Sequence, residues 1–206
     1  MKMYNAALWS TLLISSYMQS ADTVAAQQLL NDRLKSCFSN LQIGDADQIY
    51  GEVKMLFAYG ADPNTPIYGG ESMLFNLILA DASRYETVID LFLQHPHTTV
   101  NQGDRNNYTP LMAAIYCPVV LKRLLDHRDI RIDAKRSYDE RTAIDFAIEG
   151  KQVKSVELLL KSGACIDHHN SLGLTPFLRV YRPMHEEAFI SGKMSDPDLA
   201  AAIQHK

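Results

Sequence analysis

The sequence has few of the features that mark catalytic, secreted or membrane proteins. Its 206 residues include only 3 cysteines and 1 tryptophan. The cysteines (Cys37, Cys117 and Cys165) are far apart, odd in number and without a CxxC spacing, so neither a disulfide framework nor a zinc knuckle is indicated. No run of 18 apolar residues occurs, which sets aside a membrane-spanning helix. We therefore expect a reducing, cytoplasmic setting.

Excess positive charge is also absent. The formal net charge is −4 at pH 7, whereas surfaces that bind nucleic acids are usually strongly basic. The glycines form no phosphate-binding loop, because Gly69-Gly70 is not followed by Gly-Lys-Ser/Thr. With 47% hydrophobic residues, the chain can instead bury a continuous core. A nucleic-acid partner is not expected.

Histidine pairs are the only hint of a metal site. They occur as His95-Pro96-His97 and as His168-His169, both in predicted turns. Imidazole is a common zinc ligand, but no second cluster of Cys, His or acidic residues lies at ligand spacing. We expect exposed turn histidines, no metal, no cofactor and no catalytic residue. An enzyme or metal protein that uses these pairs is the competing hypothesis, and elemental analysis would test it.

The clearest pattern is a helix pair between Asp139 and Asp167. Thr142 opens an apolar run, Gly150 interrupts it, and apolar residues resume at helical spacing until Ser162-Gly163. The same order of turn, short helix, turn and longer helix recurs along the chain. Its helix-opening hydroxyl residues are separated by 37, 33 and 33 positions: Ser72, Thr109, Thr142 and Thr175.

A period near 33 indicates stacked helix pairs, and two motifs in register carry a specific resemblance. TPLMAA at Thr109, TAIDFA at Thr142 and TPFLRV at Thr175 open the helices. LFAYGADPN (Leu56–Asn64) and LLKSGACID (Leu159–Asp167) close them. In both motifs the chain resembles the ankyrin-repeat family. The resemblance implies an all-α solenoid of about five stacked helix pairs with hairpin-like loops and irregular helical caps.

The predicted organisation has three parts. Residues 22–182 form the repeat domain, with units near 22–64, 65–101, 102–133, 134–167 and 168–182. Residues 1–21 are expected to form a capping helix, with a weak signal peptide as the alternative. Residues 183–206 are expected to form a C-terminal helical cap or tail.

The chain departs from the family at one position. Where the family usually has histidine after Thr-Pro-Leu, this sequence has Phe75, Met112, Asp145 and Leu178. We therefore expect the hydrogen bonds that this histidine makes to the turns to be absent.

The resemblance implies a binding surface on the finger loops between units and on the adjacent short helices. Tyrosine and arginine, which often dominate interface energetics, recur there. The candidate partner-binding residues are Tyr68, Glu71, Arg105, Asn106, Tyr108, Arg136, Tyr138, Arg141, His168, His169, Ser171 and Leu174. The prediction is a monomeric, non-catalytic module that binds another protein. Its alternative is a bacterial or viral effector, delivered into a host cell, that binds a host protein.

Overall fold

The computed structural model describes residues 23–38, 45–67, 70–171, 173–176 and 178. The predicted N-terminal segment 1–21, the predicted tail 183–206 and Tyr68 lie outside these residues. The described part of the chain is all-α and contains no strand. None of its helices is long and apolar enough to cross a membrane.

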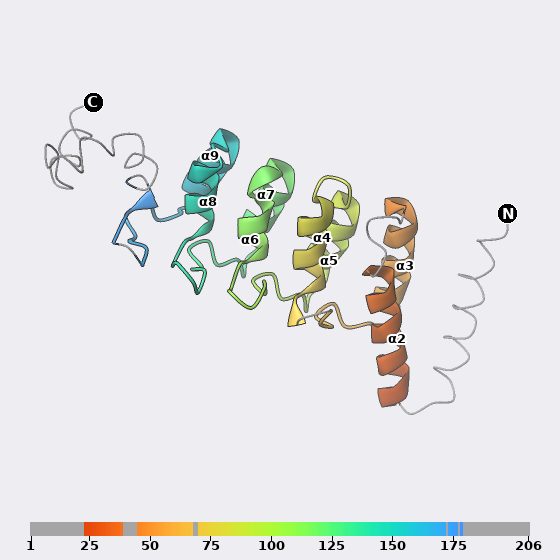
Figure 1. Cartoon of the computed structure of the whole chain (residues 1–206). Coiled ribbons are helices and arrows are strands. Elements are labelled where there is room, and N and C mark those ends of the chain that lie inside the picture. The colour runs from red at the N-terminus through yellow and green to blue at the C-terminus, as the bar shows by residue number, and fades with distance from the viewer. Residues whose placement is uncertain (1–22, 39–44, 68–69, 172, 177, 179–206) are drawn as a thin grey trace, which may run out of the picture.

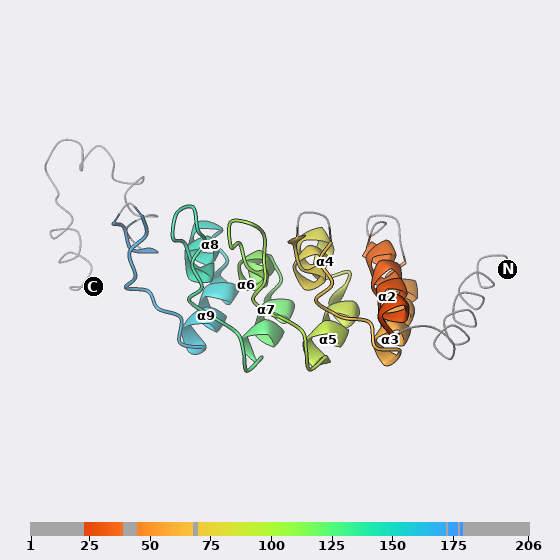
Figure 2. The same ribbon diagram turned by 90° about the horizontal axis from the view of Figure 1, so that it is seen from below.

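Within the described residues, eight helices and one 3-10 helix stack in pairs, the arrangement that the repeat pattern predicted. The pairs are α2 (Thr23–Phe38) with α3 (Ala46–Ala58), α4 (Met73–Asp81) with α5 (Glu86–Gln94), α6 (Pro110–Ala113) and η2 (Ala114–Tyr116) with α7 (Pro118–Leu125), and α8 (Ala143–Glu149) with α9 (Val153–Lys161). The pairs stand side by side in one row (Figure 1). Seen from below, α4, α6 and α8 form one row, which we call the inner helices, and α5, α7 and α9 form a second row, which we call the outer helices (Figure 2).

The hydroxyl residues of the repeat begin the inner helices. The Ser72 hydroxyl accepts a hydrogen bond from the Phe75 amide at 3.2 Å, and Thr109 accepts one from Met112 at 3.4 Å. Thr175 accepts one from the Leu178 amide at 3.4 Å. Such caps satisfy amides that have no partner within the first helical turn.

The third unit has a short connection between its two helices. Its inner helix ends as the 3-10 turn η2, and Pro118 begins α7 two residues after Tyr116. The Ile115 carbonyl accepts a 2.5 Å hydrogen bond from the buried Ser155 hydroxyl of the next unit. The fourth unit therefore supplies the hydrogen-bond donor for this buried carbonyl of the third unit.

The core is continuous through the stack, because each pair buries its apolar side against the next. Phe92 in α5 is fully buried and makes edge-to-face contacts with Phe38 of α2 and Phe57 of α3. Leu121 and Leu124 of α7 are fully buried in the same way. Stability therefore resides largely in the interfaces between neighbouring units.

A ladder of side-chain amides joins each closing turn to the next. The Asn64 amide donates to the His97 carbonyl at 2.6 Å, and its oxygen accepts from the Thr99 amide at 2.8 Å. Asn101 repeats this geometry with the Asp129 carbonyl and the Arg131 amide. In each case the hydrogen-bonded carbonyl and amide lie four and two positions before the last residue of the next unit, which is Asn101 or Asp133.

The equivalent hydrogen bonds before and after these two contacts are made by other residues. In the first unit, two side chains take the place of one asparagine: Gln27 donates to the Gly60 carbonyl, and Asn31 accepts from the Asp62 amide. At the next step Asp133 accepts from the Cys165 amide at 2.9 Å. A carboxylate has no N–H to offer to the Gly163 carbonyl at the equivalent position.

Replacing Asp133 by asparagine is expected to complete the ladder. Asp133→Asn keeps the acceptor for Cys165 and adds a donor for Gly163, so the free energy of unfolding should rise by about 1 kcal/mol. Urea unfolding measures it. Asp133→Ala, which removes both groups, should lower stability instead. An asparagine variant less stable than the parent would contradict the proposed ladder.

Candidate functional site

The finger loops lie along one edge of the row of helix pairs, where Figures 1 and 2 show them extending beyond the inner helices. Each finger is closed by a backbone hydrogen bond from its first to its last residue. The closures define finger 1 as 67–71, finger 2 as 104–108, finger 3 as 136–141 and finger 4 as 170–174. Finger 3 is thus one residue longer than the others.

Backbone hydrogen bonds also join neighbouring fingers. The Ser137 amide of finger 3 donates to the Asn106 carbonyl of finger 2 at 2.7 Å. The Ser171 amide of finger 4 donates to the Asp139 carbonyl of finger 3 at 3.3 Å. Fingers 2, 3 and 4 are therefore held in register, independently of their side chains.

One position in every finger has a left-handed backbone. It is the second residue before each helix-opening hydroxyl, and its φ values are 85°, 58°, 58° and 72° at Gly70, Asn107, Glu140 and Gly173. Glycine adopts this conformation freely and asparagine tolerates it, whereas a glutamate is strained there.

Glu140→Gly is expected to stabilise finger 3. Relief of the backbone strain should outweigh the greater freedom of glycine in the unfolded chain, for a net gain of about 0.5 kcal/mol or more. The lost ion pair with Lys135 is half-exposed and contributes little. Lys135→Ala, which removes the same pair without changing the backbone, is the control. A glycine variant less stable than this control would rule out strain at Glu140.

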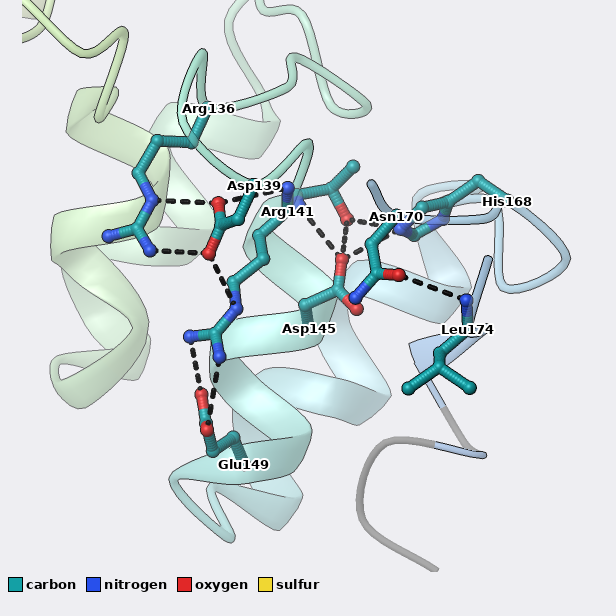
Figure 3. A network of polar contacts seen from close by, with 9 residues as sticks. Arg136, Asp139, Arg141, Asp145, Glu149, His168, Asn170 and Leu174 are labelled. Carbon is teal, nitrogen blue, oxygen red and sulfur yellow. Dashed lines mark hydrogen bonds and ion pairs between the residues drawn. The ribbon is translucent and has the colours of Figure 1, made fainter. Parts of the chain in front are cut away.

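Finger 3 is braced by a cluster of charges. Arg136 binds both carboxylate oxygens of Asp139 at 2.9 and 2.6 Å, and Arg141 contacts Asp139 at 2.8 Å. Arg141 also reaches Glu149 at the end of α8, at 2.8 Å (Figure 3). Both guanidinium groups lie over the ring of Phe146, at 4.8 and 5.4 Å from its centre. Two of the three arginines predicted to bind a partner, Arg136 and Arg141, therefore form ion pairs within the chain.

The pKa values in this cluster follow from its hydrogen bonds. Burial acts to raise the pKa of Asp139, but the bonds from Arg136 and the Arg141 amide and the two guanidinium charges outweigh it, so the pKa is lowered. The bond to Asp139 raises the pKa of Arg136. A carboxyl with a lowered folded-state pKa contributes stability at neutral pH that is lost as pH falls through that value.

Tyr108 connects three units. Its ring makes edge-to-face contacts with Phe75, at 6.0 Å between centres, and with Phe146, at 5.2 Å. Its hydroxyl donates to the Met112 carbonyl at 3.3 Å, and burial raises its pKa. Tyr108 therefore fixes the base of finger 2 on the inner helices.

His168, two residues before finger 4, forms a buried acid-histidine pair with Asp145 of the fourth unit. His168 Nε2 lies 2.7 Å from Asp145 Oδ2, and the two side chains are only 10% and 1% exposed. The same carboxylate oxygen accepts from the Thr142 amide at 2.8 Å and from its hydroxyl at 3.1 Å. His168 Nδ1 lies 3.0 Å from the Cys165 carbonyl oxygen. Figure 3 shows the side chains of His168 and Asp145 pointing toward each other.

This pair overturns two expectations. His168 is not an exposed turn histidine, although His97 and His169 are exposed; His95 is half-buried against Phe57. The prediction that the turn-binding hydrogen bonds are absent is wrong at Asp145, which binds His168 of the following turn. In the sequence, Asp145 of TAID and His168 are separated by 23 residues, and no local pattern links them. Only the stacking of the units brings the two side chains into contact.

The structure places the candidate binding residues in three groups. Arg105, Asn106, Tyr138, His169 and Ser171 are exposed, and Tyr138, in the longer finger 3, is 83% exposed. Leu174 is buried. The partly buried candidates are Glu71, Tyr108, Arg136, Arg141 and His168. The Glu71 carboxylate accepts a hydrogen bond from the Asn76 side chain.

The family model described as ankyrin repeats, in three copies, matches residues 77–170. These residues are ankyrin repeats. The match covers α5 to α9 and fingers 2 and 3, and a search of curated proteins gave no match.

Ankyrin repeats are generally protein-binding modules and typically lack catalytic activity. In these ankyrin repeats, Met112 and Asp145 stand where the family usually has histidine, and both accept a hydrogen bond from the helix-opening threonine amide. Among the residues that the structure describes, no group of three or more His, Cys, Asp or Glu side chains could hold a metal ion.

The three thiols are expected to differ sharply in reactivity. Burial, with a contribution from Glu52, raises the pKa of Cys37 to about 12, and Cys117 is buried, whereas Cys165 is exposed. Since the thiolate is the reactive form, Ellman's reagent at pH 8 should modify Cys165 rapidly and the other two only after denaturation. Two rapidly reacting thiols in the folded protein would contradict this assignment.

Proposed function

We propose that this protein is a non-catalytic adaptor that binds a partner protein through the tips of fingers 2, 3 and 4 and the adjacent inner helices. The observation that carries the proposal is the locked row of fingers, in which backbone hydrogen bonds align three loops while Tyr138 stays almost fully exposed. Preorganised loops lose little conformational entropy on binding, and an exposed tyrosine on such a loop offers a large contact area.

The exposed side chains, rather than the whole candidate set, form the proposed contact surface. The buried and partly buried candidates instead hold the fingers in place; they are Tyr108, Arg136, Arg141, His168 and Leu174. The inner helices add exposed apolar side chains at their far ends, namely Leu79 of α4 and Tyr116 of η2, which are 52% and 67% exposed.

Affinity capture from cell lysate with quantitative mass spectrometry tests this surface. The finger variant combines Asn106→Ala, Tyr138→Ser and Ser171→Ala, which leaves the backbone bonds between fingers intact. The matched control combines Lys122→Ala, Val153→Ser and Lys154→Ala on the outer helices, where all three residues are exposed. Circular dichroism establishes that both variants fold.

Loss of one protein from the finger variant alone is the expected result. Equal capture by the parent, the finger variant and the control would overturn the assignment to the finger tips. A third variant, Leu79→Ser with Tyr116→Ser, separates the inner-helix face from the fingers.

The partner's location is a separate proposal. We expect a cytoplasmic partner in the cell that makes the protein, and the alternative is a host protein met after delivery into a host cell. Fractionation of infected cells separates them, since an effector would be found in host cytosol and an adaptor would stay in the producing cell.

A further inference from the structure

The last described helix pair leaves apolar side chains uncovered at positions where an earlier pair buries them. When α7 and α9 are aligned on the fully buried Leu124 and Leu159, Leu121 and Val156 fall at the same position. Leu121 has no exposed surface, whereas Val156 is only partly buried, and Leu160, one turn further along the same face, is 45% exposed. This face of α9 is therefore less covered than the same face of α7.

The closing turns show the same trend. Val100 and Ile132 lie one position before the last residue of the second and third units, and they are buried and partly buried. Ile166, at that position in the fourth unit, is 48% exposed. Among the described residues, α7 packs between α5 and α9, whereas the main neighbours of α9 are α7 and α8. Burial is therefore lost on the side of α9 that faces away from α7, which we call the end face and define as Val156, Leu160 and Ile166.

The end face is apolar, although the terminal unit of a stack of repeats needs a polar outer face to stay soluble. We propose that residues 184–190 of this chain (MHEEAFI) pack as a helix on the end face and so close this end of the stack. These residues lie outside the part of the chain that the structure describes. The spacing of the repeat, the pattern of apolar residues and the charges assign them to this place.

The spacing of the repeat favours residues 184–190 over the rest of the tail. The Thr175 hydroxyl accepts a hydrogen bond from the Leu178 amide, as Thr109 does from the Met112 amide at the start of α6. The outer helices begin 14, 9 and 11 positions after the hydroxyl residue that opens their unit: Glu86 after Ser72, Pro118 after Thr109, and Val153 after Thr142. Residue 184 follows Thr175 by 9 positions, whereas residue 196, which begins the other predicted helix of the tail, follows it by 21.

The segment also matches the end face in apolar pattern and in charge. Its apolar side consists of three residues that share one side of a helix, namely Met184, Ala188 and Phe189. Glu186 and Glu187 lie on the opposite side of that helix and in its first turn, where acidic residues are favourable. Lys151 and Lys154 are exposed at the start of α9. A helix in the next outer position would therefore begin with acidic residues beside these lysines.

The accessibility of an introduced thiol in the full chain tests the proposal. Cys165→Ser removes the exposed native thiol, and Leu160→Cys then places a thiol on the end face. Glu157→Cys, at an exposed position of the same helix, is the matched reference. Because a thiol reacts only where the reagent can reach it, Ellman's reagent at pH 8 should modify the thiol at position 160 roughly tenfold or more slowly than the thiol at position 157.

Phe189→Asp is the variant that should uncover the end face, since a carboxylate is costly in an apolar contact. It should raise the rate at position 160 by roughly tenfold and leave the rate at position 157 unchanged. Ile203→Asp, the same kind of change in the other predicted helix of the tail, should leave both rates unchanged. Circular dichroism establishes that the variants fold, and Phe189→Ser serves if the aspartate variant does not.

Three results would overturn the assignment to residues 184–190. Equally rapid reaction at positions 157 and 160 would show that the end face is uncovered. Exposure by Ile203→Asp in place of Phe189→Asp would assign the end face to residues 196–203. Protection that grows with protein concentration would assign it to a second copy of the chain. The measurement needs no partner protein, so its result is independent of the capture experiment.

Discussion

Phe92→Ala is expected to lower the free energy of unfolding by about 4 kcal/mol, the loss found when a fully buried phenylalanine is truncated. Phe92 has no exposed surface, and its ring touches Phe38 and Phe57, so the cavity would open between the first two helix pairs. Since neighbouring units hold each other together, α2 and α3 should separate from the stack before the ankyrin repeats unfold. Urea unfolding followed by far-ultraviolet circular dichroism measures the loss.

Phe92→Leu is the control for this prediction. It keeps most of the buried apolar volume and should cost about 1 kcal/mol. Equal losses for alanine and leucine would show that the ring contacts, rather than the cavity, set the cost. A loss below about 1 kcal/mol for alanine would contradict the assignment of Phe92 to the core.

Gly103→Ala is expected to cost about 3 kcal/mol, at the upper end of what overpacking causes. A Cβ atom on Gly103 would lie 1.8 Å from the carbonyl oxygen of Tyr108 and 2.9 Å from the Cα atom of Thr109. These are backbone atoms, so no side chain can move aside. The turn that closes finger 2 must therefore open, which also displaces the ring of Tyr108 from Phe75 and Phe146.

The matched control is Gly51→Ala in α3, where a Cβ would meet nothing within 4 Å. Alanine is the better helix former, so this variant should gain roughly 0.5–1 kcal/mol. Thermal unfolding of the two variants side by side measures the contrast. Retention of full stability in the Gly103 variant would show that finger 2 can close in another way.

These two sites illustrate what can be inferred from the sequence. The apolar residues within Glu86–Gln94 recur at helical spacing in the sequence and indicate a helix with one buried face, because a 3.6-residue period is a local property. Nothing in the sequence marked Gly103 as different from Gly51, since the clash at Gly103 involves a carbonyl five residues away whose position the folded finger sets.

The binding surface divides in the same way. The repeat register placed Arg105, Tyr138 and Arg141 on fingers from the sequence alone. Only the structure shows that Arg141 pairs with Asp139 and Glu149 while Tyr138 stays exposed. Side-chain pairing depends on distances across the fold, and the extra residue in finger 3 is visible only from its backbone closure.

The sequence by itself determined the helix pairs, their period and the hydroxyl residues that begin the inner helices, because caps, apolar spacing and turn residues act over a few positions along the chain. Only the stacking of units decided which side chains meet across the fold. The examples are the hydrogen-bonded ladder from Asn64 to Asp133, the ring contacts of Tyr108 with Phe75 and Phe146, and the hydrogen bond between Asp145 and His168. These contacts join residues 23 or more positions apart, or different elements, and they exist only once neighbouring units bury their apolar faces against each other.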